Sequence, residues 1–393
     1  MNPKIGRTAF NARKILKSIA SLSILLHCAN IPFIAQTAMA QTAAPAPPSE
    51  IYAGIELTAE DVRAIALRVS RSEEESGLQL IYSENIRLAL GPAGDGQFTP
   101  EAANEAAETI LKLLARLRQQ FQASPQHVFL IGGGLGADRT EELVKTINKS
   151  TGKSITFLDA KTEIQLSLVG TIPRLSKVGE TMIDTRNSSA LIEIDKSRTR
   201  GGYQLLKHPL YGANGANGAN GANRPNSKDA AEAAHRYDFV TMNIPHGAAS
   251  EASFRRALRE EREIKPGLVN RKRVYLTGSV PWAVATLLYP ENRQPFVQLT
   301  IEEIEDFAEK VARAPREIFN PNLSFIRDRE SRRKARSELE AVRSAFTPEL
   351  LVAGVETLRA VAGEFEWREK QIWFARFGYL GCLLSYVRLR VER

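Results

Sequence analysis

Cysteine and histidine are scarce in this chain. Of its 393 residues only Cys28 and Cys382 are cysteines, and five are histidines. A structural zinc site needs four ligands drawn mainly from these two residue types, and the histidines show no ligand-like spacing, so a cysteine-based zinc site is excluded. A disulfide would need both cysteines. If the N-terminal segment that holds Cys28 is removed, the fold therefore depends on packing alone.

A strong excess of one charge is also missing. Lys and Arg outnumber Asp and Glu by 53 to 45, which gives a net charge of +8. Five of these eight excess charges come from the start of the chain, where no acid accompanies them: Lys4, Arg7, Arg13, Lys14 and Lys17. Nucleic-acid binding needs clustered cations on one face, so the remaining charge does not predict it.

The first 40 residues are typical of a secretory signal. A basic stretch ends at Lys17, an apolar stretch covers 19–34, and Ala38-Met39-Ala40 provides the small residues that a signal peptidase requires. We therefore predict cleavage after Ala40 and a periplasmic or secreted protein. Lipid anchoring at Cys28 is the alternative, and the bulky His27 before it makes that alternative less favourable.

The rest of the chain predicts an α/β fold. Residues 41–50 form a Pro/Ala linker, and three strand-like segments then precede a helix at 100–121 and an alternation of strands and helices to residue 170. Three further strand-like segments follow at 180–185, 188–195 and 201–208. We predict a first domain at 51–175, a second at 176–393, a disordered GAN-repeat loop at 212–228, and no transmembrane span in the mature chain.

The order of these segments resembles the Ppx/GppA family of exopolyphosphatases and guanosine pentaphosphate phosphohydrolases. The resemblance runs from Ile51 to the C-terminus and is strongest at GQFTPEAANEAAETILKLL, HVFLIGGGLGADRTEELVKTINKSTG and KQIWFARFGYLGCLL. It implies two actin-like (RNase H-like) ATPase-fold domains around a central cleft, with phosphate groups held between hairpin turns. It also implies Mg²⁺ and removal of the terminal phosphate from polyphosphate or another phosphoanhydride.

The family's first phosphate turn, A-x-I-D-L-G-S-N-S, corresponds to AGIELTAED at 53–61. The acid is kept as Glu56, but Thr58 replaces a glycine and two acids, Glu60 and Asp61, follow it. The family's catalytic run, S-G-x-E-E-A, corresponds to DAKTEI at 159–164, where only the second glutamate remains, as Glu163. The resemblance therefore implies Glu163 and Glu56 as the catalytic carboxylates.

The family's second turn, D-I-G-G-G-S, is placed by this resemblance at 184–189, where all three glycines are replaced. A third turn, G-T-G-G-T-A, corresponds to 276–281. Glu56 and Asp184 are the implied metal ligands, since Mg²⁺ sites use one or two carboxylates. The implied phosphate-binding residues are Arg186, Asn187, Ser188, Ser189, Thr277 and Gly278.

Two function classes stay open at this point. One is an exported phosphoanhydride hydrolase whose altered turns make its activity weak or absent. The other is a non-catalytic module on the same fold that binds a polyanion or a protein. A homodimer is the assembly we consider for either class. The GGGLG run at 132–136 lacks the GK[ST] ending of a P-loop and is interpreted as a tight turn.

Overall fold

The computed structural model describes residues 50–391 apart from 60, 72–75, 89–97, 134–139, 174, 179–180, 207–236 and 247–250. The predicted signal peptide, nearly all of the linker and the GAN-repeat loop lie outside the described residues. Among the helices that are described, none is long and apolar enough to cross a membrane.

The first sheet contains the three strands that the sequence predicts. It has the order β3-β2-β1-β4-β5, with β1, β2 and β3 antiparallel and β4 and β5 parallel to β1 and to each other. A helix of 22 residues, α1, packs on it and starts at Thr99, whose side chain accepts a hydrogen bond from the Ala102 N–H. The elements are β1 (Glu50–Leu57), β2 (Asp61–Arg71), β3 (Ser76–Arg87), α1 (Pro100–Phe121), β4 (Val128–Gly132), α2 (Glu141–Thr151) and β5 (Thr156–Phe157).

The second sheet repeats the beginning of the first. Its order is β10-β9-β8-β11-β13-β12, in which β8, β9 and β10 are antiparallel and β11 and β13 run parallel to β8. Every residue of β8 is buried, as expected for a central strand covered on both faces. The strands are β8 (Ser189–Ile194), β9 (Arg198–Leu206), β10 (Tyr237–Pro245), β11 (Arg273–Thr277), β12 (Phe296–Leu299) and β13 (Gln371–Ala375). Its helices are α5 (Glu251–Ile264), α6 (Gly267–Asn270), α7 (Ser279–Leu288), α8 (Ile301–Arg313), α9 (Arg329–Ala345) and α10 (Pro348–Glu364).

The prediction that residues 180–185 open this second sheet is wrong. The strand β7 (Thr181–Asp184) pairs with β6 (Leu175–Val178) in a separate two-stranded sheet, and a short 3₁₀ turn (Arg186–Ser188) then leads into β8. The run ETMIDT at 180–185 has two adjacent apolar residues between polar ones, and this pattern does not reveal the partner strand. The second sheet therefore begins one strand later than the sequence suggests.

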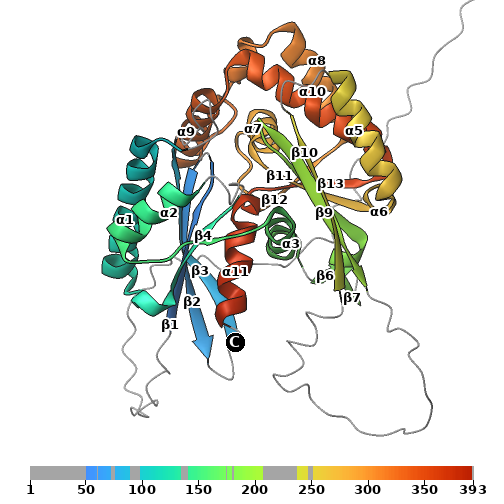
Figure 1. The fold of residues 1–393 in the computed structure, drawn as a ribbon. Helices are drawn as coiled ribbons and strands as arrows, with labels where there is room; N and C mark the ends of the chain where they lie inside the picture. The colour runs from blue at the N-terminus through green and yellow to red at the C-terminus, as the bar shows by residue number, and fades with distance from the viewer. Residues whose placement is uncertain are drawn as a thin grey trace, which may run out of the picture. The chain divides into compact units, whose positions relative to one another are not determined.

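Two helices join the sheets: α3 (Ala160–Thr171) and the C-terminal α11 (Gly381–Val391). Figure 1 shows α11 in red beside the blue strands of the first sheet, with α3 next to it. Leu383 and Val387 of α11 share a buried cluster with Tyr52 and Leu67. The last helix thus packs on the first sheet, although it lies in the segment assigned to the second domain, and the predicted boundary at 175 stays a prediction.

Candidate functional site

The β1–β2 and β8–β9 hairpins have equivalent turns. In the first, the Thr58 N–H donates to the Asp61 carbonyl over 2.9 Å; in the second, the Asp195 N–H donates to the Arg198 carbonyl over 3.0 Å. Both turns close a four-residue segment between the first two antiparallel strands of a sheet. The turn of the second sheet is therefore 195–198, after β8, and the sequence-based placement at 184–189, before β8, is wrong.

Each hairpin also carries the same charged pair two residues outside its turn. In the first hairpin Glu56 of β1 lies opposite Arg63 of β2, and in the second Glu193 of β8 lies opposite Arg200 of β9. Arg63 Nη1 is 3.5 Å from Glu56 Oε2, and Arg200 Nη2 donates to Glu193 Oε1 over 2.8 Å. The two halves of the chain thus present matching glutamate–arginine pairs.

The helix α3 brings a third carboxylate to these pairs. Asp159 caps the helix by accepting the Thr162 N–H over 2.8 Å, and this places Glu163 in the first turn. Arg200 forms an ion pair with Glu163 as well as with Glu193, so one guanidinium joins two buried carboxylates. The more exposed Arg198 lies 4.0 Å from Glu163.

Glu56 and Glu163, the two predicted catalytic residues, converge on Gly133 at the end of β4. A Cβ built on Gly133 would lie 3.0 Å from Oε1 of each glutamate, and both side chains are about 1% exposed. The lack of a side chain at this position leaves the space that the two carboxylates occupy. The structure therefore brings the pair together, and the catalytic role of each stays a prediction.

The predicted phosphate-binding residues at 186–189 are bonded elsewhere. Arg186 donates to the carbonyls of Ile172 and Val169, over 3.1 and 2.6 Å, at the far end of α3 from Glu163. The hydroxyls of Ser188 and Ser189 both donate to the Thr185 carbonyl, and the Asn187 side chain accepts from Gln204. These contacts hold the entry to β8.

Thr277 and Gly278, by contrast, lie beside the second turn. Gly278 has a φ of +97°, and a Cβ there would lie 2.5 Å from the Ile194 carbonyl, so glycine is required. The next residue, Ser279, begins α7, and its N–H donates to Asp195 Oδ1 over 2.8 Å. A carboxylate of the chain itself thus lies at a helix N-terminus, where a phosphate could otherwise bind.

Burial and neighbouring charges move the pKa values of this cluster in opposite directions. Burial raises the pKa of Glu56 to about 7, with Arg63 opposing the shift and Glu163 adding to it. Burial and the nearby Glu193 likewise raise the pKa of Asp195 to about 7. Burial would also raise the pKa of Glu193, but the charge and hydrogen bond of Arg200 hold it at about 2. At neutral pH the cluster therefore contains carboxylates in both protonation states.

These residues fit a magnesium ion poorly. Asp184 ends β7, and its side chain lies outside the described part of the structure; across that part, no three His, Cys, Asp or Glu side chains gather as metal ligands would. Glu56 faces Arg63, and its raised pKa opposes the deprotonated form that a metal requires. The cation at this site is supplied by the arginines of the chain.

Sequence reasoning missed Arg63, Glu193, Asp195, Arg200 and Cys382. Cys382 lies on α11, and burial together with the charges of Glu56 and Glu163 raises the pKa of its thiol. Arg63, Glu193 and Arg200 had one available signal, which is a glutamate followed seven residues later by an arginine in both strand pairs. Nothing in the sequence marks Cys382, because its neighbours come from the other end of the chain.

The sequence matches no protein-family model and no curated protein. Solved structures do match: a Ppx/GppA family member from Aquifex aeolicus has a TM-score of 0.55 and 13% identity, over 88% of this chain and 100% of its own. An exopolyphosphatase from Cytophaga hutchinsonii has a TM-score of 0.52 and 11% identity, over 86% and 98%. The fold is the actin-like ATPase fold. At such identity the likeness establishes the fold and leaves the chemistry to the residues.

Proposed function

We propose that this chain is an exported Ppx/GppA-like protein that no longer hydrolyses phosphoanhydrides efficiently and serves as a non-catalytic binding module. The observation that carries the proposal is the double ion pair of Arg200, whose guanidinium contacts Glu163 and Glu193 within the chain. Export, cleavage after Ala40 and homodimerisation are parts of the same proposal and come from the sequence.

The two hairpin turns support this reading because they offer negative charge where a phosphate needs hydrogen-bond donors. In the first turn the Thr58 hydroxyl donates to Asp61 Oδ1 over 2.6 Å and accepts the Asp61 N–H over 3.1 Å. In the second turn Asp195 accepts the Ser279 N–H. These three donors are bonded within the chain, and in each turn an aspartate side chain accepts a hydrogen bond that a phosphate would need.

The predicted base is also poorly suited to its task. A general base must reach the attacking water with a lone pair available. The Glu163 carboxylate is about 1% exposed, and Arg200 is ion-paired to its Oε1. Arg200 therefore occupies an oxygen that a general base would offer to the attacking water.

One observation favours the second candidate, an active phosphoanhydride hydrolase. The pKa of Glu56 is raised to about 7, near the value that suits a general base at neutral pH. Thr277 and Gly278 at the second turn would then contact the substrate. Activity through Glu56 is therefore the alternative that the experiment has to exclude.

Phosphate release from long-chain polyphosphate tests the two candidates. The protein starting at residue 41 is assayed with and without Mg²⁺ beside a Glu56→Gln/Glu163→Gln double variant, which controls for a contaminating phosphatase. We expect the same background release from both. Release that disappears in the double variant would overturn the proposal.

Retention of polyphosphate on the immobilised protein identifies the kind of partner. Retention without release indicates a polyanion-binding module, and absence of both indicates a protein partner. N-terminal sequencing of the protein from the extracytoplasmic fraction tests the export proposal, with Gln41 as the expected first residue. A chain that keeps its first 40 residues in the cytoplasm would contradict that part.

A further inference from the structure

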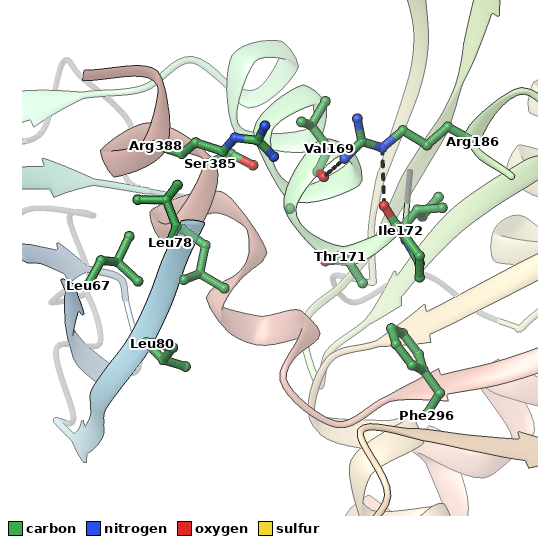
Figure 2. Close-up of a pocket in the computed structure, with 13 residues that line it drawn as sticks. Leu67, Leu78, Leu80, Val169, Thr171, Ile172, Arg186, Phe296, Ser385 and Arg388 are labelled. Carbon is green, nitrogen blue, oxygen red and sulfur yellow. Dashed lines mark hydrogen bonds between the residues drawn. The ribbon is translucent and has the colours of Figure 1, made fainter. Parts of the chain in front are cut away.

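A pocket of about 380 Å³ lies at the end of α3 opposite to Glu163. One wall comes from β2, β3 and α11, with Leu67, Leu78 and Leu80 on the sheet. The facing wall comes from the last turn of α3 and from Phe296 of β12. Figure 2 shows the leucines on one side of the pocket and Phe296 on the other.

The polar groups of the pocket gather at one edge. Arg186 and Arg388 come from opposite walls, and Figure 2 shows both guanidinium groups near Val169, away from Leu80 and Phe296. Among the described residues that line the pocket none is acidic. An apolar cavity with two cations at one end is therefore complementary to an amphiphile with an anionic head.

Ser385 adds a second, independent observation. It lines the same pocket beside Arg388, one helical turn earlier on α11, and its side chain is 3% exposed. Its hydroxyl has no hydrogen-bond partner in the described structure. A buried hydroxyl without a hydrogen-bond partner destabilises the fold, and a head group that accepts a hydrogen bond from it would remove that cost.

We propose that this pocket binds a single-chain amphiphile with an anionic head, of the fatty-carboxylate type. The anionic head of the ligand lies between Arg186 and Arg388 and accepts a hydrogen bond from the Ser385 hydroxyl. Its hydrocarbon chain lies along the leucines toward Phe296. The volume favours one chain, because 380 Å³ corresponds to roughly a dozen water-sized groups at about 30 Å³ each.

This binding is separate from the chemistry of the hairpin turns. The turns and their carboxylates lie at the N-terminal end of α3, whereas the pocket is lined by 169–172 at the C-terminal end. The proposal therefore does not rest on the proposed function, and polyphosphate release or retention leaves it unaffected.

Isothermal titration with dodecanoate tests the proposal, with dodecyl phosphate and dodecyltrimethylammonium as comparison ligands below their micellar concentrations. We expect saturable binding of one dodecanoate per chain. Saturable binding of dodecyl phosphate as well would support recognition of the anionic head, which both ligands share. Equal binding of the trimethylammonium compound, or no saturable binding of either anion, would overturn the proposal.

Two pairs of variants locate the site. Leu80→Asp places a charge in the apolar wall and should weaken dodecanoate binding at least tenfold, whereas Leu205→Asp, at a strand leucine of similar exposure, should not. Arg388→Gln should weaken dodecanoate binding about tenfold and leave the affinity for neutral dodecanol unchanged. Arg390→Gln, on the same helix, should change the affinity for neither ligand. Equal effects within either pair would place the ligand elsewhere.

Discussion

Arg200 is the residue on which the charged cluster depends most, and replacing it with methionine tests the structure directly. Its side chain is 6% exposed and contacts Glu163 and Glu193, which are 2% and 10% exposed. Methionine has a similar length but no charge, so both carboxylates would stay buried without a cation. Removing one partner of a buried ion pair costs about 3–5 kcal/mol.

We therefore expect Arg200→Met to lower the free energy of unfolding by about 3–5 kcal/mol at pH 7. This is a large fraction of the stability of a typical protein. Arg198→Met is the matched control, because Arg198 is 26% exposed and 4.0 Å from Glu163. A partly exposed pair at that distance contributes about 1 kcal/mol or less.

The loss should also depend on pH. In the native protein Arg200 holds the pKa of Glu193 at about 2, below its ordinary value of 4.5, so this stabilisation is present above pH 4.5 and lost as the pH falls toward 2. In the variant, burial without the cation raises that pKa, and protonation restores stability as the pH falls. The difference between the two proteins should shrink from pH 7 to pH 4.

Urea denaturation followed by tryptophan fluorescence at pH 7 and pH 4 measures both effects. The reasoning is refuted if Arg200→Met costs less than about 1 kcal/mol, or if its cost equals that of Arg198→Met. An equal cost at both pH values would refute the electrostatic explanation and leave only lost packing.

Three further predictions concern other parts of the chain. The pKa of Glu56 is about 7 in the folded protein, against 4.5 in the unfolded chain. The resulting stabilisation is present below pH 4.5 and is lost as the pH rises through 7. Between pH 5 and 8, urea titrations should therefore show that the free energy of unfolding falls by up to about 3 kcal/mol more in the native protein than in Glu56→Gln. Gly170→Ala would place a Cβ 2.0 Å from the Gly381 carbonyl and should cost about 1–3 kcal/mol in the same assay, whereas Gly363→Ala, where nothing lies within 4 Å, should not destabilise. Thr300→Ala removes the side chain that accepts the Glu303 N–H at the start of α8 and should lower the free energy of unfolding by about 1 kcal/mol; no measurable change would mean that the cap contributes nothing.

The strands and helices were largely predictable because their patterns are local. The apolar and β-branched residues in 62–70 belong to a strand that is covered on both faces, and the helical spacing in 100–121 reflects burial of one face; both elements formed as predicted. The additional strands β6 and β12 have four residues each, too few for a pattern to distinguish them from loops.

The site was only partly predictable, because strand pairing is not local. Treating 180–185 as the first strand of the second sheet moved the expected phosphate turn to 184–189 and hid Glu193 and Arg200. The pairing of β7 with β6 depends on contacts that its own residues do not encode. Glu56 and Glu163 were found because each lies in a short run, AGIELTAED and DAKTEI, that resembles a family motif residue by residue.

The packing of α11 on the first sheet has a consequence for how the protein is made. Tyr52 and Leu67 leave the ribosome more than 300 residues before Leu383 and Val387, which cover them. A nascent chain that has completed all of β1 to α3 therefore still exposes an apolar surface on its sheet. Until α11 has been synthesised and has docked, that surface is one to which a chaperone can bind.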